Sequence, residues 1–278
     1  MRYSDNPPFL MISSSGPADY HHSNLFGLYR KTEKMSEGRS VYVQEHDPQQ
    51  KGIDNVFSEL SLDSPKEVEL FSDNGVWVIK NYRIDCDGAL LRTATSSQSP
   101  ASVKWQYMET RYGKVAWEDD QELTVTSLDE KQPSECEVTI SLSEDIISEF
   151  TDPRVAGVYR ADGSYLWGRP VLKHSEGGFT LQTSSEKPYG HIMWSGQPKM
   201  FLDDVSWKLI DDEGEPFFVL SGSAPSLCPA DPRSRTNGQR YNLYTPKLKK
   251  ELGIWTMVGP VRSQESSGIT LKCSKHSY

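Results

Sequence analysis

Two stretches of the sequence, residues 27–41 (GLYRKTEKMSEGRSV) and residues 157–171 (GVYRADGSYLWGRPV), decide the fold because they are copies of one pattern. Each reads Gly-x-Tyr-Arg and then Gly-Arg-x-Val, and the two copies lie 130 residues apart. The same offset places Trp77 on Trp207 with no gap. A spacing shared by two motifs and a tryptophan indicates an internal duplication. We expect both tryptophans to fill the cores of the two halves, the alternative being two exposed stacking platforms.

Outside these motifs the two copies align less closely. The offset of 130 residues also places Phe71 on Phe201. Trp105 corresponds to Trp255 only if the second copy carries extra residues. We predict this inserted loop near residues 233–252, where polar and turn-forming residues are typical of a surface connection.

Local sequence patterns favour β-strands in both halves. Short runs such as 40–44 and 76–79 are rich in β-branched and aromatic residues, and turn formers such as 73–75 separate them. The 20 glycines and 17 prolines disfavour long helices. We therefore predict an all-β protein with few short helices and two tandem, duplicated antiparallel β domains, residues 1–132 and 133–278. Each domain is expected to be a sandwich or a small barrel.

The order of the motifs resembles a tandem module of predicted protist and algal proteins, written G-x-Y…G-R-P-V-Y…W-x-I…P…W. The resemblance covers residues 20–105 and 150–255. The first copy departs from the module by reading Ser40-Val41-Tyr42, and the second by reading Pro170-Val171-Leu172. The module has no assigned activity, so the resemblance implies repetition and leaves the chemistry open.

Composition excludes several classes of partner. The chain has 30 Lys and Arg against 39 Asp and Glu, a formal charge of −9. This charge disfavours nucleic acid, because neutralising phosphates needs a concentrated basic surface. No apolar run approaches the roughly 18 residues of a membrane span, so a soluble protein is expected. No secretory leader is recognisable, which favours a cytoplasmic location and leaves secretion open if a leader precedes this sequence. The oligomeric state is not indicated.

The metal-binding and redox residue types are sparse and scattered. The adjacent His21 and His22 would point to opposite sides of an extended segment, so we predict no metal site and no cofactor. The cysteines lack the close spacing of zinc sites and redox dithiols. Their even number permits two disulfides, but a chain of this size does not need them, so free buried thiols are expected. The four are Cys86, Cys136, Cys228 and Cys273.

Catalysis has little support in the sequence. Neither a phosphate-binding loop nor a Gly-x-Ser-x-Gly nucleophile motif occurs. Carboxylate pairs such as Asp119 with Asp120 and Asp211 with Asp212 are the remaining candidates, and in an acidic protein such pairs are mostly solvated turns. An enzyme is therefore disfavoured. The alternative function kept open is a carbohydrate-active hydrolase with a carboxylate pair in a cleft between the domains.

The arginines that recur in both copies are the best functional lead. A guanidinium is a planar fork of donors suited to carboxylates, phosphates and aromatic faces. These arginines either pair with nearby carboxylates within the molecule or, if exposed, give two anion or glycan sites that act together. We predict a non-catalytic binding or scaffold protein that recognises a glycan or a protein. The predicted binding residues are Arg30, Arg39, Tyr42, Arg160, Trp167 and Arg169.

Overall fold

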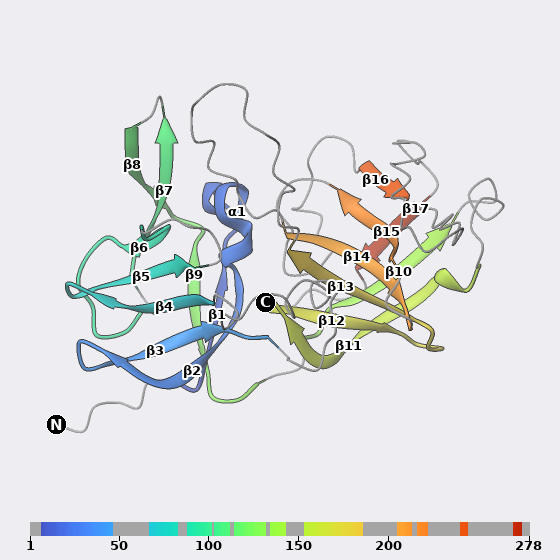
Figure 1. The fold of residues 1–278 in the computed structure, drawn as a ribbon, viewed down its shortest axis with the longest axis horizontal. Helices are drawn as coiled ribbons and strands as arrows, with labels where there is room; N and C mark the ends of the chain where they lie inside the picture. The colour runs from blue at the N-terminus through green and yellow to red at the C-terminus, as the bar shows by residue number, and fades with distance from the viewer. Residues whose placement is uncertain are drawn as a thin grey trace, which may run out of the picture.

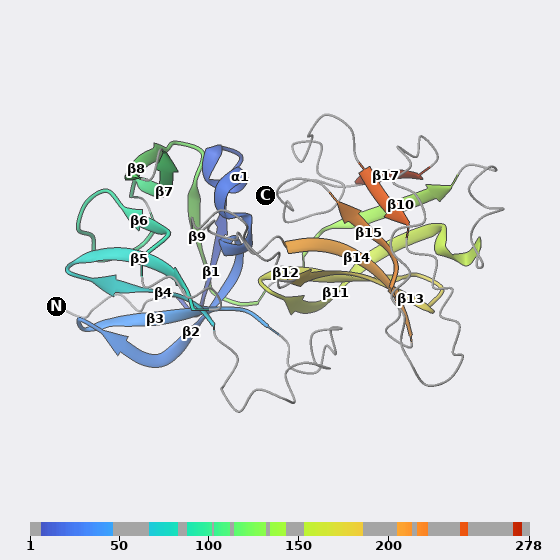
Figure 2. The same cartoon turned by 45° about the horizontal axis from the view of Figure 1, so that its top comes forward.

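The computed structural model describes residues 7–46, 67–82, 88–101, 103–111, 114–131, 134–142, 153–185, 205–212, 216–221, 240–243 and 269–273. These residues form two antiparallel sheets, one from each half of the chain, with little helix (Figures 1 and 2). The predicted all-β class with two antiparallel β units is therefore confirmed. No helix within the described ranges has the length and apolar character needed to cross a membrane.

The first sheet has the strand order β8-β7-β6-β5-β4-β3-β2-β1-β9. Its helical pieces, α1 (Pro17–His22) and the 3₁₀ turn η1 (Ser23–Leu25), lie between β1 and β2. The strands are β1 (Phe9–Ser13), β2 (Gly27–Ser36), β3 (Arg39–Gln44), β4 (Val68–Asp73), β5 (Val76–Asn81), β6 (Leu91–Thr93), β7 (Trp105–Arg111), β8 (Lys114–Asp120) and β9 (Thr124–Leu128).

The second sheet has the order β16-β15-β14-β13-β12-β11-β10-β17. A 3₁₀ turn, η2 (Pro153–Val155), precedes β11 as η1 precedes β2. The strands are β10 (Glu137–Leu142), β11 (Gly157–Leu166), β12 (Arg169–His174), β13 (Phe179–Ser185), β14 (Val205–Asp211), β15 (Pro216–Ser221), β16 (Arg240–Leu243) and β17 (Ile269–Cys273).

Each half is one curled sheet, which is closer to the barrel alternative than to two stacked layers (Figure 2). Neighbouring strands follow one another along the chain, and the last strand returns to pair with the first. The tight turns have the sequences this arrangement needs. Asn74 and Gly75 join β4 to β5 with φ values of 53° and 81°, the left-handed conformation that glycine and asparagine adopt most readily.

The core of the first half lies on the inner face of the curled sheet. Trp77 and Trp105 are buried there, and each indole N–H donates to a backbone carbonyl, of Ser97 at 3.0 Å and Pro100 at 3.1 Å. These bonds remove the cost of burying the polar edge of the ring. Trp207 is buried in the second half. The prediction that Trp77 and Trp207 fill the two cores is therefore confirmed.

The two halves share one strand register. Tyr29 pairs with Gln44 across β2 and β3, and Tyr159 pairs with His174 across β11 and β12. Both hairpins contain an irregularity at the same place, between residues 31 and 35 and between residues 161 and 165. Pairing of β1 with β2 and of β10 with β11 also matches residue for residue. Equal register and an equal irregularity support the predicted duplication.

The ungapped alignment fails at the fourth strand of each half, β4 and β13. Leu70 and Leu181 face equivalent residues on the preceding strand, so β13 is the counterpart of β4. The register places Gln182, not Phe201, in the position of Phe71, and Phe201 lies outside the described residues. The first half has a long connection before this strand and a short one after it, and the second half has the reverse. The two differences cancel, which restores the offset of 130 residues at Trp207.

The predicted counterpart of Trp105 is also wrong. Trp105 pairs with Thr93 on β6, and Tyr241 makes the equivalent pairing with Leu220 on β15. Trp255 lies outside the described residues. Residues 233–252 are therefore not only an inserted loop, because β16 lies within them and extends the second sheet.

The predicted domain boundary at residues 132 and 133 falls between the two sheets, after β9 and before β10. Whether the halves are independent domains stays a prediction. Cys136, next to β10, is disulfide-bonded, so the expectation of free thiols is wrong for this residue. Disulfides persist mainly in oxidising compartments, so this bond gives no support to the predicted cytoplasmic location, which stays a prediction.

Candidate functional site

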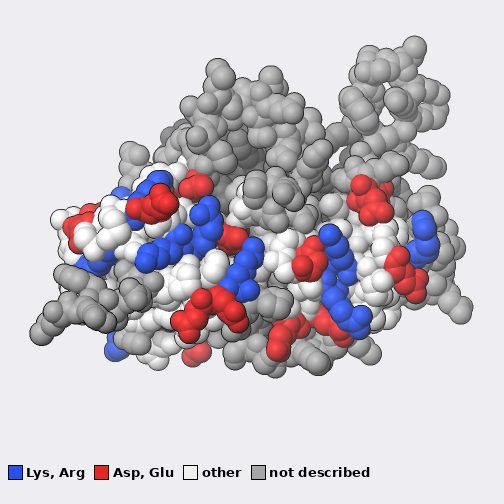
Figure 3. Space-filling view, turned by 90° about the horizontal axis from the view of Figure 1, so that it is seen from below, with Lys and Arg blue, Asp and Glu red and all other residues white. Residues whose placement is uncertain are grey.

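Two of the predicted binding arginines take part in ion pairs with carboxylates of neighbouring segments. Arg30 on β2 has its Nε 3.1 Å from Glu45 Oε2, and Arg160 on β11 has its Nε 2.5 Å from Glu137 Oε2. Both arginine side chains are exposed, so each pair is worth at most about 1 kcal/mol. Figure 3 shows the same pattern across one face of the molecule, where basic and acidic side chains lie side by side in both halves.

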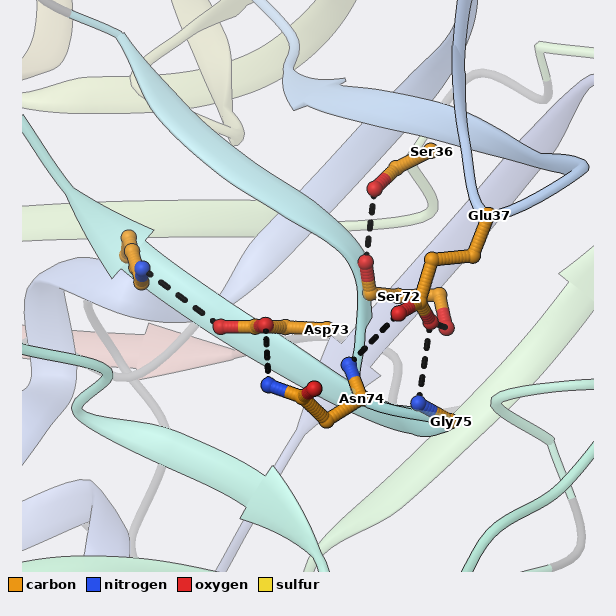
Figure 4. A network of polar contacts seen from close by, with 7 residues as sticks. Ser36, Glu37, Ser72, Asp73, Asn74 and Gly75 are labelled. Carbon is orange, nitrogen blue, oxygen red and sulfur yellow. Dashed lines mark hydrogen bonds and ion pairs between the residues drawn. The ribbon is translucent and has the colours of Figure 1, made fainter.

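Arg39 contacts the turn between β4 and β5. Its Nη1 donates to Ser72 Oγ at 2.5 Å and to the Gly75 carbonyl at 3.1 Å, and its guanidinium lies 5.9 Å from the Trp77 ring centre. Glu37 contacts the same turn, accepting hydrogen bonds from the Ser72 hydroxyl at 2.7 Å and from the Gly75 N–H at 2.9 Å (Figure 4). Arg39 therefore helps to join the β2–β3 hairpin to the β4–β5 hairpin.

Arg169, Trp167 and Tyr42 lie in packed surroundings. Arg169 is fully buried, with its Nη1 3.4 Å from the carbonyls of Phe26 and Trp167. The Trp167 ring stacks on His46 with 4.3 Å between the ring centres. Tyr42 is fully buried, donates to the Pro7 carbonyl at 3.1 Å, and has its pKa raised to about 12 by burial.

The six predicted residues do not converge on one surface. Trp167 lies in the β11–β12 turn and Arg169 begins β12, whereas the other four lie on β2, β3 and β11. Tyr42 and Arg169 are buried and reach a ligand only if the fold rearranges. A binding role for the six residues stays a prediction. A guanidinium with donors left for a ligand is found at another arginine, Arg92, which is half-buried.

Arg92 lies on the outer face of the first sheet, in a row of polar side chains that crosses three strands. The register places Arg92 on β6 opposite Gln106 on β7, and Gln106 opposite Asp119 on β8. Arg92 Nε donates to Gln106 Oε1 at 3.1 Å, and Gln106 Nε2 donates to Asp119 Oδ1 at 2.8 Å. The alternate residues, such as Leu91 and Tyr107, point into the core.

The guanidinium of Arg92 also lies over an aromatic ring. Its Cζ is 4.2 Å from the ring centre of Trp117, which pairs with Met108 two residues along from the Gln106 pair. Such a contact contributes about 0.5–2 kcal/mol and fixes the plane of the guanidinium. Within the described part of the chain, the terminal nitrogens Nη1 and Nη2 of Arg92 have no hydrogen-bond partner. A held guanidinium with two unused donors is suited to binding one carboxylate, sulfate or phosphate group.

This site was not predicted, because it depends on strand register. Arg92, Gln106 and Asp119 are far apart in the sequence and meet only when β6, β7 and β8 pair. Trp117 gave the one available signal, an aromatic residue alternating with charged ones in a strand-like run. The second half does not repeat the site, because the register places Val219 in the position of Arg92.

Asp119 and Asp120, a predicted candidate for a catalytic pair, point to opposite faces of β8. Asp120 is buried and accepts hydrogen bonds from Ser14 Oγ at 2.8 Å and the Ala18 N–H at 3.0 Å, at the start of α1. Asp119 is exposed and bonded to Gln106. Two carboxylates on opposite faces cannot act on one bond, so this pair is not an acid and base couple.

The adjacent histidines lie on a short helix, α1, and not on the extended segment expected. His22 Nε2 is 2.7 Å from the Met108 carbonyl, and burial lowers the pKa of His22 to about 4. His21 stacks on Tyr107 and has its Nε2 4.0 Å from Glu109 Oε1. Among the described residues, no three His, Cys, Asp or Glu side chains come together in a way that could hold a metal ion.

The chain was compared with known proteins. No protein-family model, no curated protein and no solved structure matches it. The functional interpretation therefore rests on the geometry of this chain, and the resemblance to a tandem protist and algal module stays a prediction.

Proposed function

We propose that this chain is a non-catalytic binding or scaffold protein that recognises an anionic group of a glycan or protein partner through Arg92. The observation that carries the proposal is the fixed guanidinium, held by Gln106 and Trp117 and retaining two donors. The predicted combination of an arginine fork with an aromatic ring is present here, at a residue other than those predicted. Because the site occurs in the first half, we expect one binding site per chain and not two.

Two of the described carboxyl groups have a resolved pKa shift, and both pKa values are lowered. A hydrolase needs one carboxyl whose pKa is raised so that it can donate a proton. The hydrogen bond from the Ser72 hydroxyl, helped by the Gly75 N–H, lowers the pKa of Glu37. Burial raises the pKa of Asp162, but hydrogen bonds from Ser164 and Lys173 outweigh it and the net pKa shift is downward. Neither carboxyl has the property of a general acid.

The proposal is tested by screening the full chain against an array of acidic and neutral oligosaccharides and a set of acidic peptides, followed by calorimetry with the best probe. We expect an acidic probe to bind with one site per chain. Arg92→Ala should weaken binding by about 10- to 100-fold, the loss expected for hydrogen bonds to a charged group. Arg92→Lys should recover only part of it, because an ammonium lacks the planar fork.

Arg30→Ala is the matched control, since Arg30 is another arginine on the first sheet, exposed and paired with Glu45. It should leave affinity unchanged. Loss of binding in Arg30→Ala with retention in Arg92→Ala would move the site to the residues predicted from the sequence. Turnover of a sugar substrate by the wild-type chain would replace the binding function by the hydrolase alternative.

A further inference from the structure

The two halves are joined by the turn between β11 and β12, which inserts into the first sheet. The Leu28 N–H donates to the Gly168 carbonyl at 2.8 Å, and the Gly168 N–H donates to the Glu45 carbonyl at 2.8 Å. The Glu45 N–H donates to the Leu28 carbonyl at 2.7 Å. In an uninterrupted antiparallel pair Leu28 and Glu45 would exchange both bonds directly. Gly168 therefore occupies a slot between β2 and the end of β3.

Glycine is required on both sides of this contact. A Cβ on Gly27 would collide with the Gly168 carbonyl, and a Cβ on Gly168 would lie 2.9 Å from Gln44 Cγ. Next to the slot, the Trp167 ring stacks on His46. The repeated Gly-x-Tyr and Gly-Arg motifs thus meet across the molecule, with the first glycine of one copy against the second glycine of the other.

The second half has the same slot. Val158 and Ser175 are the counterparts of Leu28 and Glu45, and the Ser175 N–H donates to the Val158 carbonyl at 2.8 Å. Among the described residues, the return bond from the Val158 N–H to the Ser175 carbonyl is not made. Within the described residues, the Val158 N–H and the Ser175 carbonyl therefore have no backbone partner, at the place where Leu28 and Glu45 bond to Gly168.

The first half has the same turn. Glu37 and Gly38 have φ values of 51° and 75°, and Trp167 and Gly168 have 54° and 73°. A Cβ on Gly38 would meet nothing within 4 Å. The β2–β3 turn is therefore open at Gly38, while the Glu37 side chain contacts the β4–β5 turn, and its backbone shape fits such a slot.

The two slots differ in one side chain. In the first half Gln44 Nε2 donates to the carbonyls of Asn24 and Phe26, which leaves the face of Gly27 to Gly168. Its counterpart His174 is buried, with its Nε2 3.2 Å from the Ala156 carbonyl. The His174 ring covers the face of Gly157 so closely that a Cβ there would collide with it.

We propose that the second half carries a docking slot for the Glu37–Gly38 turn of a second copy of this chain, and that the His174 ring closes it. The contact joins unlike surfaces, so repeating it between molecules would build an open head-to-tail assembly. Because His174 stands where the first half has Gln44, the contact forms once, between the two halves of the same molecule.

The test is His174→Gln, which gives the second slot the side chain found in the first. In analytical ultracentrifugation across a concentration series, we expect the wild-type chain to sediment as one species and His174→Gln to form oligomers that grow with concentration. Adding Gly38→Ala should abolish the oligomers, because the new Cβ would meet the slot. The control Gly163→Ala, at another open glycine with a φ of 86°, should leave them intact.

Two results overturn the proposal: a His174→Gln chain that does not assemble, or oligomers that persist with Gly38→Ala. If His174→Gln fails to fold, as judged by near-ultraviolet circular dichroism, the reciprocal Gln44→His provides the decision. It places the ring in the occupied slot and should expel the Trp167–Gly168 turn, which raises the radius of gyration measured by X-ray scattering. An unchanged radius of gyration would exclude a closing role for the ring.

Discussion

At the residue scale, the clearest trace of duplication is a pair of buried tyrosines. Tyr29 donates its hydroxyl to the Leu25 carbonyl at 2.5 Å, and Tyr159 donates to the Val155 carbonyl at 2.7 Å. Each bond ties a β-strand to the 3₁₀ turn four residues earlier. Burial raises the pKa of Tyr159, so this hydroxyl keeps its proton and remains a donor over the physiological range.

Replacing either tyrosine by phenylalanine should lower stability by a similar amount. Tyr29→Phe and Tyr159→Phe each leave a buried carbonyl without its hydrogen bond, which costs about 1–3 kcal/mol. The free energy of unfolding from urea titration checks this. Tyr82→Phe, at an exposed tyrosine, is the control and should change little. If only one of the two substitutions lowers the free energy of unfolding, the tyrosine hydrogen bond does not stabilise the two copies equally.

At the element scale, the Glu37 carboxylate joins two hairpins of the first sheet by hydrogen bonds. Glu37 in the β2–β3 turn accepts from the Ser72 hydroxyl and from the Asn74 and Gly75 N–H groups of β4 and its turn (Figure 4). The hydrogen bond from Ser72, followed by that from Gly75, lowers the pKa of Glu37 below its ordinary value of 4.5. A lowered pKa in the folded state contributes stability above the unfolded pKa, and this contribution is lost as pH falls through the folded value.

Glu37→Gln should therefore weaken the pH dependence of stability on the acid side. The wild-type chain should lose stability as the pH falls below about 4.5, and the variant should lose less because it has no proton to gain there. Urea midpoints measured at pH 7 and pH 3 give the comparison. Glu33→Gln neutralises an exposed carboxylate on the same hairpin and should retain the wild-type slope. An equal change in urea midpoint between pH 7 and pH 3 for the wild type and Glu37→Gln would contradict the stabilising role of the Glu37 hydrogen bonds.

The elements also show what the sequence can and cannot predict. The hairpin motifs and the core tryptophans were predicted because local turn chemistry and periodic burial are written into contiguous residues. The strands β4 and β13, which follow the matching hairpins, were misaligned. The connection before β4 is long and the one after it is short, whereas β13 has the reverse, so the offset on either side hides the shift at Phe71. The Arg92 site was missed for a related reason: its residues meet only through the pairing of three strands, and register is a property of the folded sheet.

At the scale of the whole molecule, the duplication produced one asymmetric joint. The second half supplies the turn and the first half supplies the slot, and Lys131, between the sheets, lies 2.8 Å from Glu45 Oε1 beside that slot. The joint uses backbone hydrogen bonds that depend on close approach at Gly27. The contact between the halves thus depends on Gly27. The equivalent glycine, Gly157, has no part in it.

Gly27→Ala should separate the halves, whereas Gly157→Ala should not. Both glycines have positive φ values, of 124° and 152°, so alanine strains the backbone at either place by about 1–3 kcal/mol. At Gly27 the new Cβ also collides with the Gly168 carbonyl, which cannot withdraw without breaking its bond to Leu28. At Gly157 the collision is with the His174 ring of the same half. X-ray scattering should show a larger radius of gyration for Gly27→Ala alone, while thermal melting shows destabilisation in both. An equal expansion in both variants would mean that the Gly168 contact is not what joins the halves.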